Sequence, residues 1–288
     1  MKPLLALATL PFLLSSCMVL DLGWEEGNGV AATEIRSLPS FSRVRLDAPV
    51  HVVIKTGPTY QAYVTSDANL TTAFQTDAFA GTLTIGMTSG ISPTIEPEIV
   101  IVMPDLRGLT HNGNGLVEIE EDGDFPDVSL TMNGGGEIFF SGTATTLKAN
   151  VNGSGVITLE GYASLLVADL RGDGRIHAEN LLAGDADVDL SGSGAVFLDL
   201  DYQSQLDLIL TGSGTVEWWG APSKLNYSLL GTGKVVEHRG LPKKSAAAKT
   251  SVTAPSGAAA KAGAISGSYE SVPTVPKKTI KFSAATKR

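Results

Sequence analysis

The sequence predicts an all-β protein built around a parallel β-helix, a β-solenoid with turns of about 20 residues. Three observations predict it: a Gly-x-Gly triplet recurs seven times, apolar and polar residues alternate on both sides of each triplet, and 32 of the 288 residues are Gly. No run of roughly 10–12 residues within the repeats keeps the 3.6-residue period of a helix. Such regular repetition is typical of a chain whose turns stack on one another.

The glycine triplets set the period, because their first glycines lie 21, 19, 19, 20, 20 and 19 residues apart. We expect them to form tight corners, which need positive φ angles and leave little room for Cβ atoms when stacked. A phosphate-binding loop is excluded, since no helix is expected after any triplet and neither Gly-Lys-Ser nor Gly-Lys-Thr occurs. The corner glycines are Gly113, Gly115, Gly134, Gly136, Gly153, Gly155, Gly172, Gly174, Gly192, Gly194, Gly212, Gly214, Gly231 and Gly233.

The residues beside the corners predict which side chains face inward. The second residue after each triplet is Val or Ile in all seven copies, and the second residue before it is apolar in six. Strands with period-two alternation therefore enter and leave each corner. Each buried Val, Leu or Ile contributes roughly 1.5–3 kcal/mol, so the stacked columns supply most of the driving force for folding. One large open sheet of serial hairpins is the structural alternative.

The solenoid is expected over residues 40–242. Its first part, residues 40–106, and the segment that follows it, residues 243–288, both differ from the repeats in composition. Residues 40–106 lack the triplet but contain strand patterns at Val44–Ile54, Gln61–Thr65, Thr82–Met87 and Glu98–Met103. We expect them to form irregular first turns, because a solenoid must cover its terminal edges. Residues 243–288 are rich in Ala, Lys, Ser and Pro without apolar periodicity, which predicts a disordered basic tail.

The N-terminus predicts export and lipid attachment. Residues 1–16 form a short apolar signal segment that ends in Leu14-Ser15-Ser16, immediately before the chain's single cysteine, Cys17. The residues Leu14-Ser15-Ser16-Cys17 resemble a bacterial lipobox, which implies cleavage before Cys17 and diacylglycerol on its sulfur. The same resemblance implies the outer membrane, because Met18 follows Cys17 where Asp would indicate inner-membrane retention. Residues 17–39 are expected to form a linker. An ordinary signal peptide with an unused cysteine is the alternative.

Charge is distributed unequally along the chain. Residues 243–288 carry nine Lys or Arg and one acid, so the total of −9 leaves −17 for residues 1–242. A strongly acidic head excludes nucleic acid as its partner. The +8 tail could instead contact anionic envelope polymers such as peptidoglycan or lipopolysaccharide.

Carboxylates recur at equivalent positions of successive turns. Stacking would align them in ladders, which are candidates for weak Ca²⁺ binding because rows of oxygen ligands suit a hard cation. Like charges about 5 Å apart in water repel by only about 0.8 kcal/mol, so a solvated face without metal is the leading alternative. The candidate ligands are Glu160, Glu179 and Asp199 in one column, and Asp169 with Asp189 and Asp187 with Asp207 in two others. No other cofactor is expected.

Aromatic pairs and histidines offer few further candidates. In Trp218-Trp219 and Phe139-Phe140 one ring must point inward and the other outward, so Trp219 and Phe139 could form a sugar-binding or protein-binding platform. The four histidines lack the spacing of metal ligands, and no catalytic residue is assigned. Because β-helices also host polysaccharide lyases and hydrolases, a carbohydrate-active enzyme stays open as an alternative.

The segments FSRVRLDAPVHVVIKTG, YQAYVTSDANL, AGTLTIG and IVIVMPDLRGLTHNGNG, followed by the Gly-Ser-Gly corners, resemble the bacterial auto-transporter adhesin head GIN domain family in their order. The resemblance covers residues about 40–240. It implies a right-handed β-helical head on an envelope protein without established enzyme activity.

These observations predict a non-enzymatic, lipid-anchored envelope protein whose solenoid presents a binding or adhesive surface to an envelope glycan or protein, in the periplasm or at the cell surface. A structural scaffold that polymerises through open solenoid ends is a further alternative. The oligomeric state is not predicted.

Overall fold

The structure is a computed structural model that describes residues 24–120 and 124–238. These residues form a β-solenoid with turns of roughly 20 residues, one short 3₁₀ helix, η1 (Thr71–Ala73), and no α-helix among them. The predicted fold class is therefore confirmed. The predicted signal segment, Cys17 and the basic tail at 243–288 lie outside the described residues.

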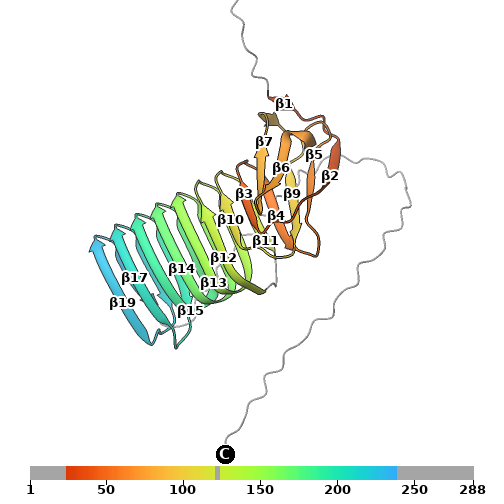
Figure 1. The fold of residues 1–288 in the computed structure, drawn as a ribbon. Coiled ribbons are helices and arrows are strands. Elements are labelled where there is room, and N and C mark those ends of the chain that lie inside the picture. Colours follow the sequence, from red (N-terminus) through yellow and green to blue (C-terminus); the bar gives the residue numbers. More distant parts are fainter. Residues whose placement is uncertain (1–23, 121–123, 239–288) are drawn as a thin grey trace, which may run out of the picture. The chain divides into compact units, whose positions relative to one another are not determined.

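The repeats form a stack of parallel strands (Figure 1). Every pairing between repeat strands is parallel, so the alternative of serial antiparallel hairpins is wrong. The strands are β10 (Gly108–His111), β11 (Leu116–Glu120), β12 (Asp124–Met132), β13 (Glu137–Gly153), β14 (Val156–Gly172), β15 (Arg175–Gly192), β16 (Ala195–Leu200), β17 (Gln205–Gly212), β18 (Thr215–Trp219), β19 (Lys224–Gly231) and β20 (Lys234–His238).

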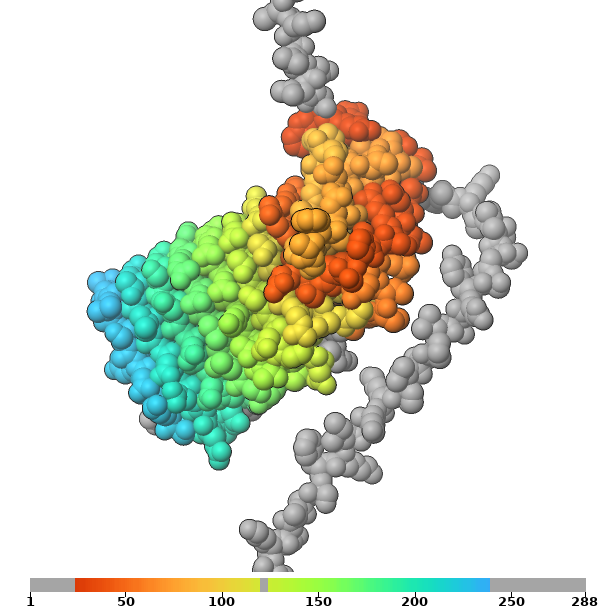
Figure 2. Space-filling model, in the orientation of Figure 1, coloured from red at the N-terminus to blue at the C-terminus, as the bar shows by residue number. Residues whose placement is uncertain are grey.

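Each turn contributes one strand segment on either side of its glycine corner. The strands that lead into the corners form the pre-corner face: β10, β12, the later halves of β13 to β15, β17 and β19. The strands that leave the corners form the post-corner face: β11, the first parts of β13 to β15, β16, β18 and β20. In Figure 2 the colour runs in bands from yellow-green to blue, because neighbouring turns present adjacent strips of surface.

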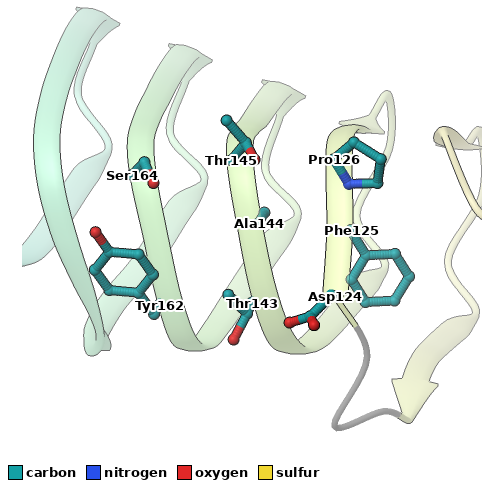
Figure 3. A pocket seen from close by; sticks show the side chains of 8 residues that line it. All are labelled: Asp124, Phe125, Pro126, Thr143, Ala144, Thr145, Tyr162 and Ser164. Atoms are coloured by element: carbon teal, nitrogen blue, oxygen red, sulfur yellow. The ribbon is translucent and has the colours of Figure 1, made fainter.

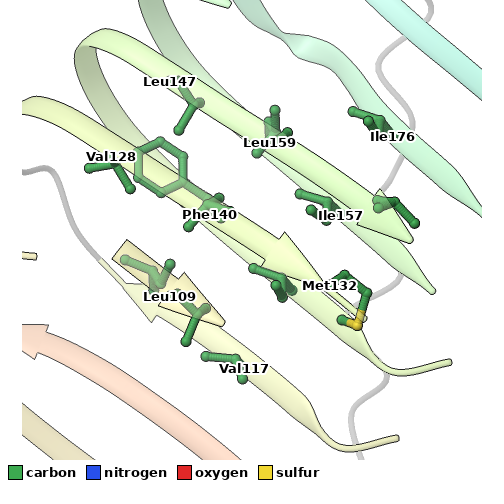
Figure 4. Packing of buried hydrophobic residues seen from close by; sticks show 14 of the residues in the cluster. Leu109, Val117, Val128, Met132, Phe140, Leu147, Ile157, Leu159 and Ile176 are labelled. Carbon is green, nitrogen blue, oxygen red and sulfur yellow. The ribbon is translucent and has the colours of Figure 1, made fainter. Parts of the chain in front are cut away.

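The core lies between the two faces. The Val and Ile column after the corners is buried in six of the seven turns, with Val117, Ile138 and Ile157 at most 1% exposed, whereas Val235 in the last turn is partly buried. Figure 4 shows members of this column, Val117, Ile157 and Ile176, among the side chains of the core cluster that includes Leu109, Phe140 and Leu159. The one polar residue in the column before the corners, His111, is also buried, and its Nε2 lies 2.8 Å from the carbonyl oxygen of Gly115.

Two different constraints explain most of the corner glycines. Gly192 has a φ of 138°, and a Cβ there would collide with the carbonyl oxygen of Gly172 in the turn before it. Gly194 lacks a positive φ but would meet the Gly174 carbonyl in the same way. At Gly113 neither reason applies, because its φ is not in the left-handed region and an added Cβ would meet nothing closer than 3.5 Å.

Two more turns precede the repeats. They consist of β3 (Arg43–Leu46) with β4 (His51–Thr56), and of β7 (Thr82–Met87) with β9 (Glu98–Met103). The β3–β4 turn lies between the β7–β9 turn and the β10–β11 turn. After β4 the chain therefore first builds the β7–β9 turn on one side of β3–β4 and then the β10–β11 turn on the other side. Its corner, Asp47–Val50, interrupts the strand expected at Val44–Ile54.

Antiparallel strands cover this N-terminal end, as the need to protect a terminal edge predicts. β6 (Phe74–Phe79) pairs with β7, β5 (Gln61–Asp67) pairs with β9, and β2 (Ala31–Ser37) pairs with β5. A small separate sheet joins β1 (Glu25–Glu26) to β8 (Ile91–Ser92). Residues 31–37 were expected in a linker, but their alternation fits an edge strand and the structure places them in the head.

Candidate functional site

An asparagine ladder crosses the corners of four successive turns. Asn152 Nδ2 donates to Asn133 Oδ1 at 2.9 Å, Asn133 Nδ2 to Asn112 Oδ1 at 2.8 Å, and Asn112 Nδ2 to Asp47 Oδ1 at 2.6 Å. Burial tends to raise the pKa of Asp47, but hydrogen bonds from Arg45 and Asn112 and the charge of Arg45 lower it overall. Sequence reasoning missed this ladder, although Asn before the first glycine of three consecutive triplets could have revealed it.

The two aspartate ladders of the pre-corner face form in the expected register. Asp169 lies opposite Asp189, and Asp187 lies opposite Asp207. Burial and then the charges of Asp207 and Asp185 raise the pKa of Asp187. Side-chain hydrogen bonds from Asn226 and Gln205 lower the pKa of Asp207. Each oxygen of the Asp207 carboxylate thus accepts a hydrogen bond from an amide group.

The third expected column, Glu160 with Glu179 and Asp199, does not form. Glu160 lies opposite Asn180, and Asp199 lies opposite Leu182. The strand register shifts around Ala178–Leu182, where β15 accommodates an extra residue as a bulge. Glu179 is turned into a largely buried position, where its Oε1 lies 3.1 Å from His177 Nδ1. Counting from the corner therefore gave the wrong neighbours beyond the bulge.

No metal centre is evident in the described part of the chain. Within residues 24–120 and 124–238, no three His, Cys, Asp or Glu side chains converge on a common point. The paired aspartates could contribute oxygen ligands only two at a time.

The post-corner face carries two stacked ring pairs. The rings of His177 and Phe197 lie 4.9 Å apart and nearly parallel, and those of Trp219 and His238 lie 4.4 Å apart. His238 Nε2 is 2.8 Å from a carboxylate oxygen of Glu217. Because the stacking partner covers one face of the Trp219 ring, this residue offers less of a platform than expected. Its neighbour Trp218 is buried, as the adjacent pair predicted.

A separate surface depression has a volume of about 330 Å³ (Figure 3). It lies over the middle of β13 and β14, where the chain leads from the post-corner face to the pre-corner face. Its lining forms two outward rows on three successive turns, with inward-facing residues between them. One row is Asp124, Thr143 and Tyr162, the other is Pro126, Thr145 and Ser164, and Phe125 and Ala144 lie between. Sequence reasoning missed this site, because the rows come together only through the register of the turns.

The polar side chains that line the depression form no side-chain hydrogen bonds or ion pairs with other described residues. Asp124, the hydroxyls of Thr143, Thr145 and Ser164, and Tyr162 make no side-chain hydrogen bond or ion pair with another described residue. Tyr162, at one end of its row, is 38% exposed. The arrangement offers an aromatic ring, one carboxylate and three hydroxyls to a ligand.

Comparison with known families gives a direct match. The family described as "Putative auto-transporter adhesin, head GIN domain" matches residues 40–222, more than half of the chain. The chain belongs to the head GIN domain family. The resemblance inferred from the ordered segments is thereby confirmed, and membership supports an adhesion-type protein.

Solved structures share the fold of this head GIN domain. The crystal structure of a putative adhesin from Bacteroides fragilis is 20% identical, with a TM-score of 0.67 over 74% of this chain and 99% of that one. A putative lipid binding protein from Parabacteroides distasonis is also 20% identical, with a TM-score of 0.63 over 75% of this chain and 100% of that one. A putative adhesin from Parabacteroides merdae is 20% identical, with a TM-score of 0.58 over 74% and 98%. No curated protein matches the sequence.

The described residues of the head GIN domain protein include no helix with the length and hydropathy needed to cross a bilayer.

Proposed function

We propose that this head GIN domain protein is a non-enzymatic, lipid-anchored envelope protein that adheres to a glycan through the depression around Tyr162. The observation that carries the proposal is a set of polar groups, without side-chain partners among the described residues, beside the exposed Tyr162. Lipid on Cys17 would hold the protein at the outer membrane, in line with the lipobox resemblance. Family membership supports the adhesive part of this proposal.

The chemistry of the depression suits a saccharide. A pyranose has an apolar C–H face, which packs against an aromatic ring, and a rim of hydroxyls that donate and accept hydrogen bonds. Tyr162 would provide the ring, Asp124 would accept from a sugar hydroxyl, and Thr143 between them can donate or accept. The three turns span about 10 Å, which is the length of one or two sugar units.

A binding role fits the depression better than hydrolysis. Glycoside hydrolysis commonly uses a pair of carboxylates, one on each side of the bond that is cleaved. Asp124 is the sole carboxylate among the described residues that line the depression. The open shape also leaves a ligand in contact with water, as expected for adhesion to a long polymer.

Binding to an array of bacterial and host glycans would test the proposal. We expect Tyr162→Ala to weaken binding of the recognised glycan roughly tenfold or more, since truncation of a ring that anchors a ligand removes its stacking surface. Phe79→Ala is the matched control, because Phe79 is 84% exposed on the N-terminal β6–β7 turn. Equal binding by wild type and Tyr162→Ala would refute the assignment.

A further inference from the structure

We propose that the outer edge of β19, with which no strand of the described residues pairs, is a self-association surface, on which β19 of a second copy of this chain adds in antiparallel orientation to give a dimer. This inference is independent of glycan binding.

The last turn exposes residues that belong to core columns. Leu225, Tyr227 and Leu229 continue the columns of Leu206, Leu208 and Leu210 in β17. The three residues of β17 are at most 2% exposed, whereas Leu225 is 39%, Tyr227 62% and Leu229 43% exposed. Three large apolar side chains in a row on an edge strand favour a partner that covers them.

The opposite end of the solenoid shows how this fold covers a terminal turn. There the antiparallel strands β5 and β6 pair with β9 and β7. As a result, Leu83, Ile85, Ile99 and Ile101 are fully buried. β19 pairs with β17, and no other strand of the described chain pairs with its outer edge.

The β19 edge is complementary to itself. Its inward residues are symmetric about Tyr227, so an antiparallel pair centred there places Leu225 opposite Leu229 of the second copy and the two Tyr227 rings opposite each other. Cross-strand apolar pairs of this kind stabilise antiparallel strands. Lys224 is the one charged residue of β19 and would lie opposite Leu230, so no like charges face each other.

Neighbouring residues limit the contact to β19. In β20, Glu237 occupies the inward column next to Trp218, and Lys234 precedes it. Such charges protect an edge strand from pairing. A two-fold contact uses the β19 edge of both copies, so no β19 edge is left to bind a third copy. The structure therefore favours a dimer over the polymeric scaffold that the sequence left as an alternative. Because an eight-residue edge is a small interface, we expect a weak dimer.

Analytical ultracentrifugation of the full chain across a dilution series tests this proposal, with Cys17→Ala throughout to prevent lipidation. We expect a concentration-dependent dimer. Tyr227→Lys, which sets two lysines opposite each other, should raise its dissociation constant roughly tenfold or more. Tyr202→Lys is the control, since Tyr202 is 75% exposed but lies in the turn between β16 and β17. A Tyr227→Cys chain should form a disulfide-linked dimer on oxidation, whereas Tyr202→Cys should not.

Two outcomes would overturn the proposal. One is a dimer that Tyr227→Lys leaves unchanged. The other is a full chain that stays monomeric at every concentration. In that case, protection of the outward backbone N–H groups of β19 from hydrogen exchange would show that another segment of the same chain covers the edge.

Discussion

The carboxylate of Asp67 accepts a hydrogen bond from the backbone N–H of Gly29, 2.7 Å away, although 38 residues separate them. The same carboxylate accepts from the N–H groups of Thr94 at 2.9 Å and Ile95 at 3.0 Å. One buried side chain at the end of β5 thus joins the segments that follow β1 and β8. Burial tends to raise the pKa of Asp67, but the hydrogen bonds from Ile95, Gly29 and Thr94 hold it below its ordinary value.

Asp67→Asn should destabilise the N-terminal cap. The amide keeps one acceptor oxygen and places an NH₂ group against backbone donors, so we expect the melting temperature at neutral pH to fall by several degrees. Because the folded pKa lies below the unfolded value of about 3.9, the stabilisation is complete above that value and is lost as pH falls through the folded pKa. Melting curves of both proteins should therefore converge in strong acid. A constant difference at every pH would contradict this role.

Gly194→Val should destabilise the solenoid by roughly 2–3 kcal/mol, because the new side chain would collide with the carbonyl oxygen of Gly174. Urea unfolding monitored by circular dichroism would measure the loss. Gly86→Val is the matched control, since an added Cβ at Gly86 meets nothing within 4 Å and its φ is not in the left-handed region. If both variants unfold like wild type, the corners do not require close stacking.

Asp187→Asn should stabilise the protein. The raised pKa of Asp187 shows that folding disfavours its charge, mainly through burial and also through Asp207 and Asp185. At neutral pH we expect a melting temperature higher by roughly 1–3 °C, a size typical of exposed charge interactions. The gain should disappear in acid, below the unfolded pKa, because Asp187 is then protonated in both states.

The neighbouring position provides a control of opposite sign. Asp207→Asn should lower the melting temperature at neutral pH, because Asn226 and Gln205 donate to that carboxylate.

Melting temperatures measured with Ca²⁺ and with a chelator distinguish the two interpretations of the aspartate ladders, a solvated face and a cation site. A solvated face predicts no change on chelation, whereas a Ca²⁺-dependent rise in melting temperature that Asp187→Asn abolishes would support a cation site.

Cys17→Ala should release the protein from membranes. Two or more acyl chains anchor a protein stably, and the sequence offers no other cysteine to carry them. Fractionation of cells and mass spectrometry of the mature N-terminus would check this expectation. Retention of the Cys17→Ala protein in the membrane fraction would show that lipid on this residue is not the anchor.

Sequence reasoning succeeded where structure follows from a local, repeated pattern. The spacing of the glycines and the alternation around them predicted parallel turns with Val and Ile inside, because each turn meets nearly identical neighbours. It also predicted that Asp187 would lie beside Asp207. Such columns follow directly from the period as long as every turn adds residues at the same place.

The tertiary structure decided the features that depend on how distant segments pair. A bulge within β15 moved Glu179 away from Glu160, because the extra residue of that turn can be inserted at any of several positions. The β3–β4 turn lies between turns that follow it in sequence, and only long-range pairing sets that order. The Tyr162 depression and the outer edge of β19, with which no described strand pairs, arise in the same way. The sequence by itself determined the repeating turn and its inward side chains, whereas the register, the order of the first turns and the coverage of each end required the folded chain, because they depend on non-local contacts.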